Sequence, residues 1–156
     1  MIVNTTRFGV VEVDEGSILT MPDGMTGFEQ YRTYVLVEHR PESVFRWLQS
    51  TEQPDLAFLV VDPSDFFADY VVDLQDWDVE YLDLRDPAEA VVLTTAAVDT
   101  QERRVTTNLL APVVINGRTR KARQVVLDRL PYALRQEIGL PEGAQIESKG
   151  PRLKTA

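Results

Sequence analysis

Short segments with β-sheet patterning, separated by turns, make up most of this chain and favour an antiparallel β architecture. Residues 7–13 approximate an alternation of apolar and polar side chains, Glu15-Gly16 can turn the chain, and residues 17–21 can return as the second arm of a hairpin. Asn116-Gly117 is the strongest short hairpin signal in the sequence. The other strand-like stretches are Tyr34–Val37, Phe45–Leu48, Leu56–Val61, Ala90–Val98, Val105–Ile115 and Arg123–Leu127. We therefore predict a small antiparallel β-barrel or barrel-like sheet.

Helical signals are confined to two places. Asp76 can cap a short helix over Trp77–Leu84, because acidic residues suit a helix N-terminus, and Asp86-Pro87 would end that helix. The stretch Pro131–Ile138 can form a second helix, although Tyr132–Arg135 within it suits a strand almost as well. The predicted fold class is thus mainly β with one or two short helices.

The length of the chain suits one domain. A protein of 156 residues buries about 68–70% of its unfolded surface, so it needs neither a disulfide nor a metal to fold. We place this domain at residues 1–148 and expect residues 149–156 to form a mobile tail. The absence of cysteine excludes thiolate metal sites and thiol catalysis, and it suits a reducing compartment. Neither a signal peptide nor a run of about 20 apolar residues is visible, so we expect a cytoplasmic protein.

Charge is divided unevenly along the sequence. Residues 1–102 hold 21 acidic and 5 basic side chains, a net charge of −16. Residues 103–156 hold 4 acidic and 11 basic side chains, a net charge of +7, which gives −9 for the whole chain. Residues 52–89 are the densest region, with 12 acids and one arginine. Such a region can attract a basic partner and repel nucleic acid, or it can simply keep the protein soluble.

The usual catalytic patterns are missing. The only histidine, His39, lies in a turn-like segment, and no serine occupies a nucleophile elbow. The glycines of residues 22–27 lack the lysine of a phosphate loop and suit a tight turn with unusual backbone angles. Asp62, Asp65 and Asp69 could gather around a metal, but their spacing does not match a calcium loop. We expect no enzyme activity, no metal and no cofactor, with a carboxylate enzyme at these aspartates as a third hypothesis.

The basic run Arg118–Arg123 has three interpretations. It can be a solvated hairpin tip beyond Asn116-Gly117, it can contact the acidic part of the same or another chain, or it can bind RNA by neutralising phosphates. No aromatic side chain interleaves the run, and the field of the whole protein is negative. A small RNA-binding β-barrel that uses Arg118–Arg123 is the alternative function.

An aromatic and acidic loop follows the apolar run at residues 56–61. It carries Phe66, Phe67 and Tyr70 among the acids Asp62, Asp65, Asp69 and Asp73. Aromatic residues after a strand can fill the core or can anchor a partner. Two adjacent phenylalanines point in different directions, so at least one can be poorly buried. An exposed aromatic ring surrounded by carboxylates would be a natural interface anchor.

Three sequence blocks carry a resemblance to a known family. They are WLQSTEQPDLAFLVVDPSDFFADY at residues 47–70, NLLAPVVIN at residues 108–116 leading to RQVVL at residues 123–127, and Gly27-Phe28-Glu29. In order and spacing they resemble the family of the flagellar assembly factor FliW. The sequence departs from the family pattern at Met25-Thr26, where an apolar residue followed by proline is common.

The resemblance implies a small β-barrel-like domain without catalytic activity that binds two alternative proteins. One partner is flagellin, held in the cytoplasm before export. The other is the carbon storage regulator CsrA, a small basic dimer that represses flagellin translation on its messenger RNA. After flagellin export, the free protein would bind CsrA and lift the repression. We expect a monomer when free, with no direct contact to nucleic acid or membrane.

The acidic and aromatic side chains would have different roles in partner binding. Complementary charge mainly sets encounter rate and partner choice, whereas buried apolar anchors set the lifetime of a complex. We assign Asp62, Asp65, Asp69 and Asp73 to steering, and Phe67 and Tyr70 to anchoring.

Overall fold

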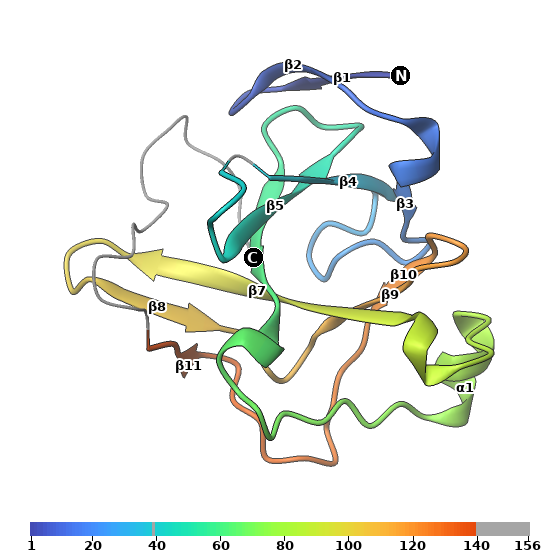
Figure 1. Ribbon diagram of the computed structural model, residues 1–156, viewed down its shortest axis with the longest axis vertical. Helices are drawn as coiled ribbons and strands as arrows, with labels where there is room; N and C mark the ends of the chain where they lie inside the picture. The colour runs from blue at the N-terminus through green and yellow to red at the C-terminus, as the bar shows by residue number, and fades with distance from the viewer. Residues whose placement is uncertain (39, 140–156) are drawn as a thin grey trace.

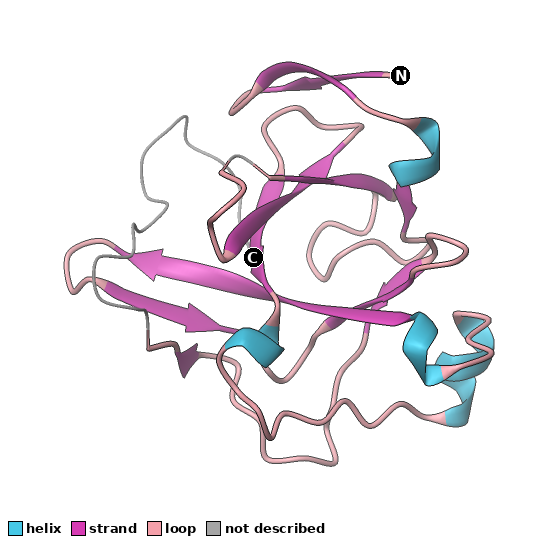
Figure 2. Cartoon of the chain, viewed as in Figure 1, coloured by secondary structure: helices cyan, strands magenta, loops and turns pink. Residues whose placement is uncertain are grey.

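The computed structural model describes residues 1–38 and 40–139, so His39 and the expected tail at residues 149–156 lie outside the described part of the chain. The strands are β1 (Ile2–Thr5), β2 (Gly9–Glu12), β3 (Leu19–Thr20), β4 (Thr33–Val37), β5 (Phe45–Ser50), β6 (Ala57–Val61), β7 (Ala90–Asp99), β8 (Arg104–Thr107), β9 (Val113–Asn116), β10 (Ala122–Gln124) and β11 (Gln136–Glu137). The helical elements are α1 (Asp76–Tyr81) and the 3-10 turns η1 (Glu15–Ser17), η2 (Pro63–Asp65) and η3 (Pro87–Glu89) (Figures 1 and 2).

One antiparallel sheet curls almost into a barrel. Its strands follow the order β10-β9-β7-β6-β5-β4-β3, and β8 and β11 extend it beside β7 (Figure 1). The two ends of this path meet at a single bridge between Thr20 and Lys121, where the amide of Thr20 donates to the carbonyl of Arg120 at 2.9 Å. No ladder continues from this bridge among the described residues, so the sheet is not closed. The predicted mainly β, antiparallel fold with few short helices is confirmed.

The long strand β7 lies at the centre of the sheet. It pairs with β6 through Thr94 and Thr95, with β9 through residues 90–93, and with β8 through residues 96–99. Residues 105–115 were predicted as one strand, but the structure interrupts them at residues 108–112. The side chain of Asn108 accepts hydrogen bonds from the amides of residues 110 and 111, both at 3.1 Å, and this local turn competes with the strand ladder.

The predicted N-terminal hairpin is wrong. β2 pairs with β1, not with residues 17–21, and its turn places Gly9 at a φ of +69°. β3 pairs instead with β4, with Leu19 opposite Tyr34. Leu19 and Met21 are then almost completely buried in the main core, which is the tertiary gain that outweighs local pairing.

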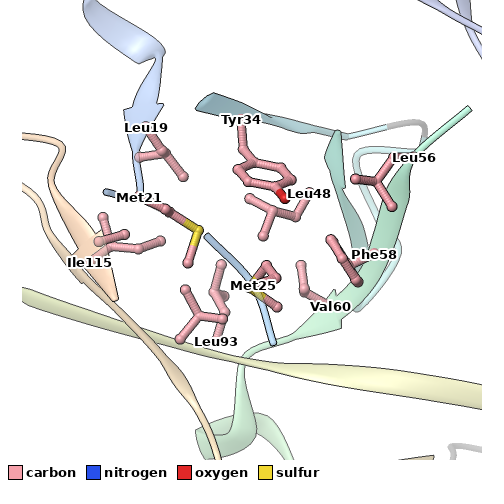
Figure 3. Close-up of a cluster of buried hydrophobic side chains, with 12 residues drawn as sticks. Leu19, Met21, Met25, Tyr34, Leu48, Leu56, Phe58, Val60, Leu93 and Ile115 are labelled. Carbon is pink, nitrogen blue, oxygen red and sulfur yellow. The ribbon is translucent and has the colours of Figure 1, made fainter. Parts of the chain in front are cut away.

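The principal core fills the inside of the curled sheet. Figure 3 shows Leu19, Met21, Met25, Tyr34, Leu48, Leu56, Phe58, Val60, Leu93 and Ile115 pointing toward one another from several strands. The turn at residues 21–28 passes through the curl and delivers Met25, which is fully buried. The departure from the family pattern at Met25-Thr26 therefore lies in a packed turn, where the amide of Thr26 donates to the side chain of Gln124 at 3.0 Å.

The two expected helices have different outcomes. The first one forms, but Gln75 rather than Asp76 is its N-cap, and the helix ends at Tyr81. Asp78 supplies the reciprocal contact of a capping box, since it accepts from the amide of Gln75 at 3.4 Å. Residues 131–138 form no helix, because residues 136–138 pair with β8 instead, and the amide of Ile138 donates to Val105 at 2.8 Å.

The turn at residues 21–28 predicts a difference between two glycine substitutions. Gly24 (φ +66°) and Gly27 (φ +88°) both have left-handed backbone angles, as the sequence predicted for this turn. A Cβ at Gly24 would lie 2.7 Å from the Cα of Glu29, whereas one at Gly27 would meet nothing within 4 Å. In urea denaturation we expect Gly27→Ala to cost about 1 kcal/mol of unfolding free energy and Gly24→Ala about 3 kcal/mol or more. Equal losses would contradict this reading of the turn.

Candidate partner-binding surface

The acidic segment, residues 62–89, connects β6 to β7 and carries the side chains that the sequence assigns to partner binding. It holds ten acids and one basic residue, Arg85. It contains η2, α1 and η3 and runs along the lower side of the molecule in Figure 1. Its apolar residues cover a core cluster formed by Leu82, Val114, Val125 and Leu127, so the segment is packed onto the sheet.

Short capping motifs fix the start of the acidic segment. Asp62 is the N-cap of η2, and its carboxylate accepts from the amide of Ser64 at 2.9 Å and from the hydroxyl of Ser64 at 2.7 Å. Pro63 is buried and occupies the first turn. Asp62 therefore has a local structural use, whereas Asp65 and Asp69 project from the same turn region into solvent.

The two aromatic side chains assigned to anchoring are already engaged within the chain. Phe67 is half-buried against the core cluster that contains Trp47 and Val61, and its ring centroid lies 6.4 Å from that of Phe66. The hydroxyl of Tyr70 donates to the carbonyl of Leu109 at 2.7 Å, and burial raises the pKa of this hydroxyl. Their role as anchors stays a prediction.

Tyr132 ties the acidic segment to the C-terminal third of the described chain. Its ring meets that of Tyr70 edge-on at 4.7 Å between centroids. Its hydroxyl accepts from the amide of Val71 at 2.8 Å. No local sequence signal predicts this contact, because Tyr70 and Tyr132 lie far apart along the chain.

Arg118 contacts the acidic part of its own chain. Its guanidinium pairs with Asp83 at 3.1 Å and also with Glu89. Hydrogen bonds from the amide of Arg85 and from the side chain of Arg118 lower the pKa of Glu89. These contacts hold the β9–β10 hairpin against the end of the acidic segment.

Arg123 makes a second set of intramolecular contacts. It pairs with the buried Asp78 and with Asp23, each at 3.4 Å, and lies 4.3 Å above the ring of Tyr81. Of the three interpretations of the basic run, contact with the acidic part of the same chain thus describes Arg118 and Arg123. Arg120 is exposed in the hairpin turn, as the solvated-tip interpretation expects.

Asn116 joins α1 to the same hairpin and was recognised in the sequence only as a turn residue. Its buried side chain donates to the carbonyls of Leu82 at 2.7 Å and Asp83 at 3.2 Å. It also accepts from the amides of Arg118 at 2.8 Å and Thr119 at 3.2 Å. One amide group therefore satisfies backbone groups at the helix end and in the hairpin turn.

The acids of the segment fall into paired and unpaired groups. Asp73 pairs with Arg129 at 2.7 Å, in a contact that is exposed on both sides and therefore weak. Within residues 1–38 and 40–139, no ion pair or hydrogen bond engages the exposed side chains of Asp65, Asp69, Asp76 and Glu80. Asp76 and Glu80 were not assigned to partner binding from the sequence, although the density of acids around them was the available signal.

Neither a metal site nor a membrane span is formed by the described residues. No three acidic or histidine side chains in this part of the chain lie close enough to hold a metal ion, so Asp62, Asp65 and Asp69 do not converge. No described helix has the length and apolar character that a membrane crossing requires.

Comparison with known proteins gives one family. Residues 2–138 match the family described as FliW protein. The flagellar assembly factor FliW of Natranaerobius thermophilus is 36% identical over 146 residues, which cover 93% of this chain and 97% of that protein. The FliW of Geobacter sulfurreducens is 37% identical over 152 residues, 97% of this chain and 94% of that protein. A crystal structure of the flagellar assembly factor FliW superimposes with a TM-score of 0.83 at 28% identity, and it covers 91% of this chain and 99% of the other.

The contacts of Arg123 generate a stability prediction. Arg123→Met keeps most of the apolar stem but leaves the buried Asp78 without its cation, so we expect a loss of about 1–2 kcal/mol of unfolding free energy. Arg104→Met is the matched control, because its pair with Glu102 is exposed on both sides (59% and 61%), and it should change stability by less than about 0.5 kcal/mol. Urea denaturation measures both values, and similar losses would show that the Arg123 contacts do not stabilise the fold.

Proposed function

The chain belongs to the FliW family of flagellar assembly factors, and we propose that it acts without catalysis by binding cytoplasmic flagellin and, when flagellin has been exported, the translational repressor CsrA. The observation that carries this proposal is the group of unpaired, exposed acids on a segment that is packed firmly onto a β scaffold. Such a surface suits recognition of a basic protein. Binding would relieve the repression of flagellin synthesis.

The physical mechanism is steric and electrostatic. A negative protein that docks on a basic RNA-binding protein occupies positive surface and repels incoming phosphates. Asp65 is the last residue of η2, and Asp76 and Glu80 lie on α1, so capped elements position these three free carboxylates before a partner arrives. Such preorganisation lowers the ordering cost of binding.

The intramolecular ion pairs speak against the alternative function in RNA binding. Arg118 and Arg123 already contact carboxylates, and a phosphate would have to displace those partners. The surrounding acids also repel a nucleic-acid backbone. A pull-down with and without nuclease separates the two functions, because protein partners survive nuclease treatment and RNA-dependent ones do not.

Charge reversal tests the steering role of the acidic segment. The double variant Asp65→Lys/Asp69→Lys should lower the association rate with CsrA about tenfold and change the dissociation rate much less. The rate for the unmodified protein should also fall as salt rises, because screening acts over about 8 Å at physiological ionic strength. Stopped-flow measurements at several salt concentrations give both rates.

The matched control reverses the same number of charges elsewhere. Glu12→Lys/Glu15→Lys changes exposed acids on β2 and η1, at the opposite side of the molecule in Figure 1. An equal slowing by both double variants would show that net charge, and not the acidic segment, controls association. An association rate that changes neither with salt concentration nor with charge reversal would rule out electrostatic steering.

A titration tests the exchange of partners. If flagellin weakens CsrA binding by some factor, CsrA must weaken flagellin binding by the same factor. Adding flagellin to a preformed complex with CsrA should therefore release CsrA and restore its binding to RNA, as measured by the mobility of labelled RNA. A stable ternary complex in which RNA binding stays blocked would contradict the exchange.

A further inference from the structure

An apolar groove lies beside α1, and none of the residues assigned from the sequence lines it. Its volume is about 480 Å³. The floor consists of Ala90 and Val92 on β7 with Val114 on β9, and the walls come from the acidic segment. The residues of the walls are Val72, Leu74, Val79, Leu84, Arg85, Asp86 and Pro87.

The chemistry of the floor limits what can bind there. Val92 pairs with Val114 across two hydrogen-bonded strands, so the groove lies on a sheet face and offers side chains but no backbone groups. An extended peptide would leave its own amides and carbonyls unsatisfied on this apolar floor. A helix satisfies its backbone internally and presents only side chains, so the face of a helix suits the groove better.

The charges around the groove determine which helix suits it. Val79 lies on α1 between two exposed acids with no partner in the described structure, Asp76 one turn before it and Glu80 beside it. Asp86 also lines the groove, and its neighbour Arg85 is the one basic residue among the lining residues. This predominance of acids at the rim favours a ligand with basic side chains beside its apolar face.

We propose that this groove binds an amphipathic helix of a partner protein, with the apolar face of that helix on the half-buried Val79 and Val92 and its Lys or Arg side chains beside Asp76 and Glu80. The inference rests on the proposed function as a protein-binding factor and specifies how a partner is held. A volume of about 480 Å³ accommodates a few side chains spaced one turn apart, not a whole helix. A second copy of this chain is a poor occupant, because its net charge of −9 repels the same acids.

Three designed peptides of about 18 residues test the chemistry of the occupant. The first has leucine along one helical face and lysine on the flanks, the second replaces lysine by glutamate, and the third scrambles the first. We expect the full chain to bind the first peptide roughly tenfold or more tightly than either of the others, as measured by fluorescence anisotropy. Equal affinity for the leucine-lysine peptide and its scrambled form would overturn the proposal, as would equal affinity for the glutamate peptide.

Two variants and one control locate the binding to the groove. Val79→Lys places a charge on its wall, and Val10→Lys is the control, because Val10 is exposed on the distant β2 hairpin. Val79→Lys should lower the affinity for the leucine-lysine peptide by about tenfold or more. Val10→Lys should leave that affinity unchanged. Asp76→Lys/Glu80→Lys changes only exposed side chains and tests the rim even where Val79→Lys does not fold. Wild-type affinity in Asp76→Lys/Glu80→Lys, or in folded Val79→Lys, would overturn the proposal.

The same variants separate the groove from the proposed function. Peptide binding that depends on Val79, in a protein that binds neither flagellin nor CsrA, would support the groove and overturn the proposed function. A protein that binds flagellin and CsrA but none of the peptides would support the proposed function and overturn the groove proposal. Displacement of a groove-bound hydrophobic dye by oleate but not by the leucine-lysine peptide would identify a small-molecule site and overturn the proposal. Dimerisation that Val79→Lys abolishes would also overturn it.

Discussion

The buried amide of Asn116 is the constraint on which the candidate partner-binding surface depends. Helix α1 is short, and the carbonyl of its C-cap residue Leu82 accepts a hydrogen bond from the amide nitrogen of this side chain. The same nitrogen also donates to the carbonyl of Asp83, which Arg118 shares. The oxygen of the same side chain organises the turn after β9. Because both halves of one amide are used, the position of the helix and the shape of the hairpin are fixed together. These contacts of Asn116 therefore help to position the acids on α1 and the groove beside that helix.

Most of the basic side chains near these contacts serve the fold. Arg118, Arg123 and Arg129 each pair with acids of residues 73–89 or with Asp23, so positive charge lies under or beside the acidic segment. This arrangement stabilises a segment that would otherwise repel itself, and it leaves other carboxylates without a cation. The acids of the segment therefore have two roles. Some pair with arginines and hold the segment on the fold, and the others are unpaired and face solvent.

Local patterns predicted the parts of the fold that local interactions form. The two strand-like stretches that become β5 and β6, and the turn at Asn116-Gly117, have their signals within a few residues, and all of them are present. The partner of β3 depends on burial of Leu19 among residues far away in the sequence, so alternation alone misassigned it. The groove likewise combines side chains from residues 72–114, which no spacing rule groups together. The acidic surface was visible as composition, but the pairing of each acid required the tertiary structure.

The single bridge between Thr20 and Lys121 has a consequence for local opening of the sheet. The bridge contributes one backbone hydrogen bond, and the contacts of Thr26 with Gln124 and of Asp23 with Arg123 add side-chain links beside it. This is far fewer backbone hydrogen bonds than the central ladders have, so we expect the sheet to open locally at this bridge first. Amides at this bridge would then exchange with solvent through local opening, whereas those of β5, β6 and β7 would need global unfolding. The bordering strands β3 and β10 are only two and three residues long, which leaves little template for another chain to add a strand. Local opening at this bridge would therefore expose only short strand edges, which limits edge-to-edge aggregation.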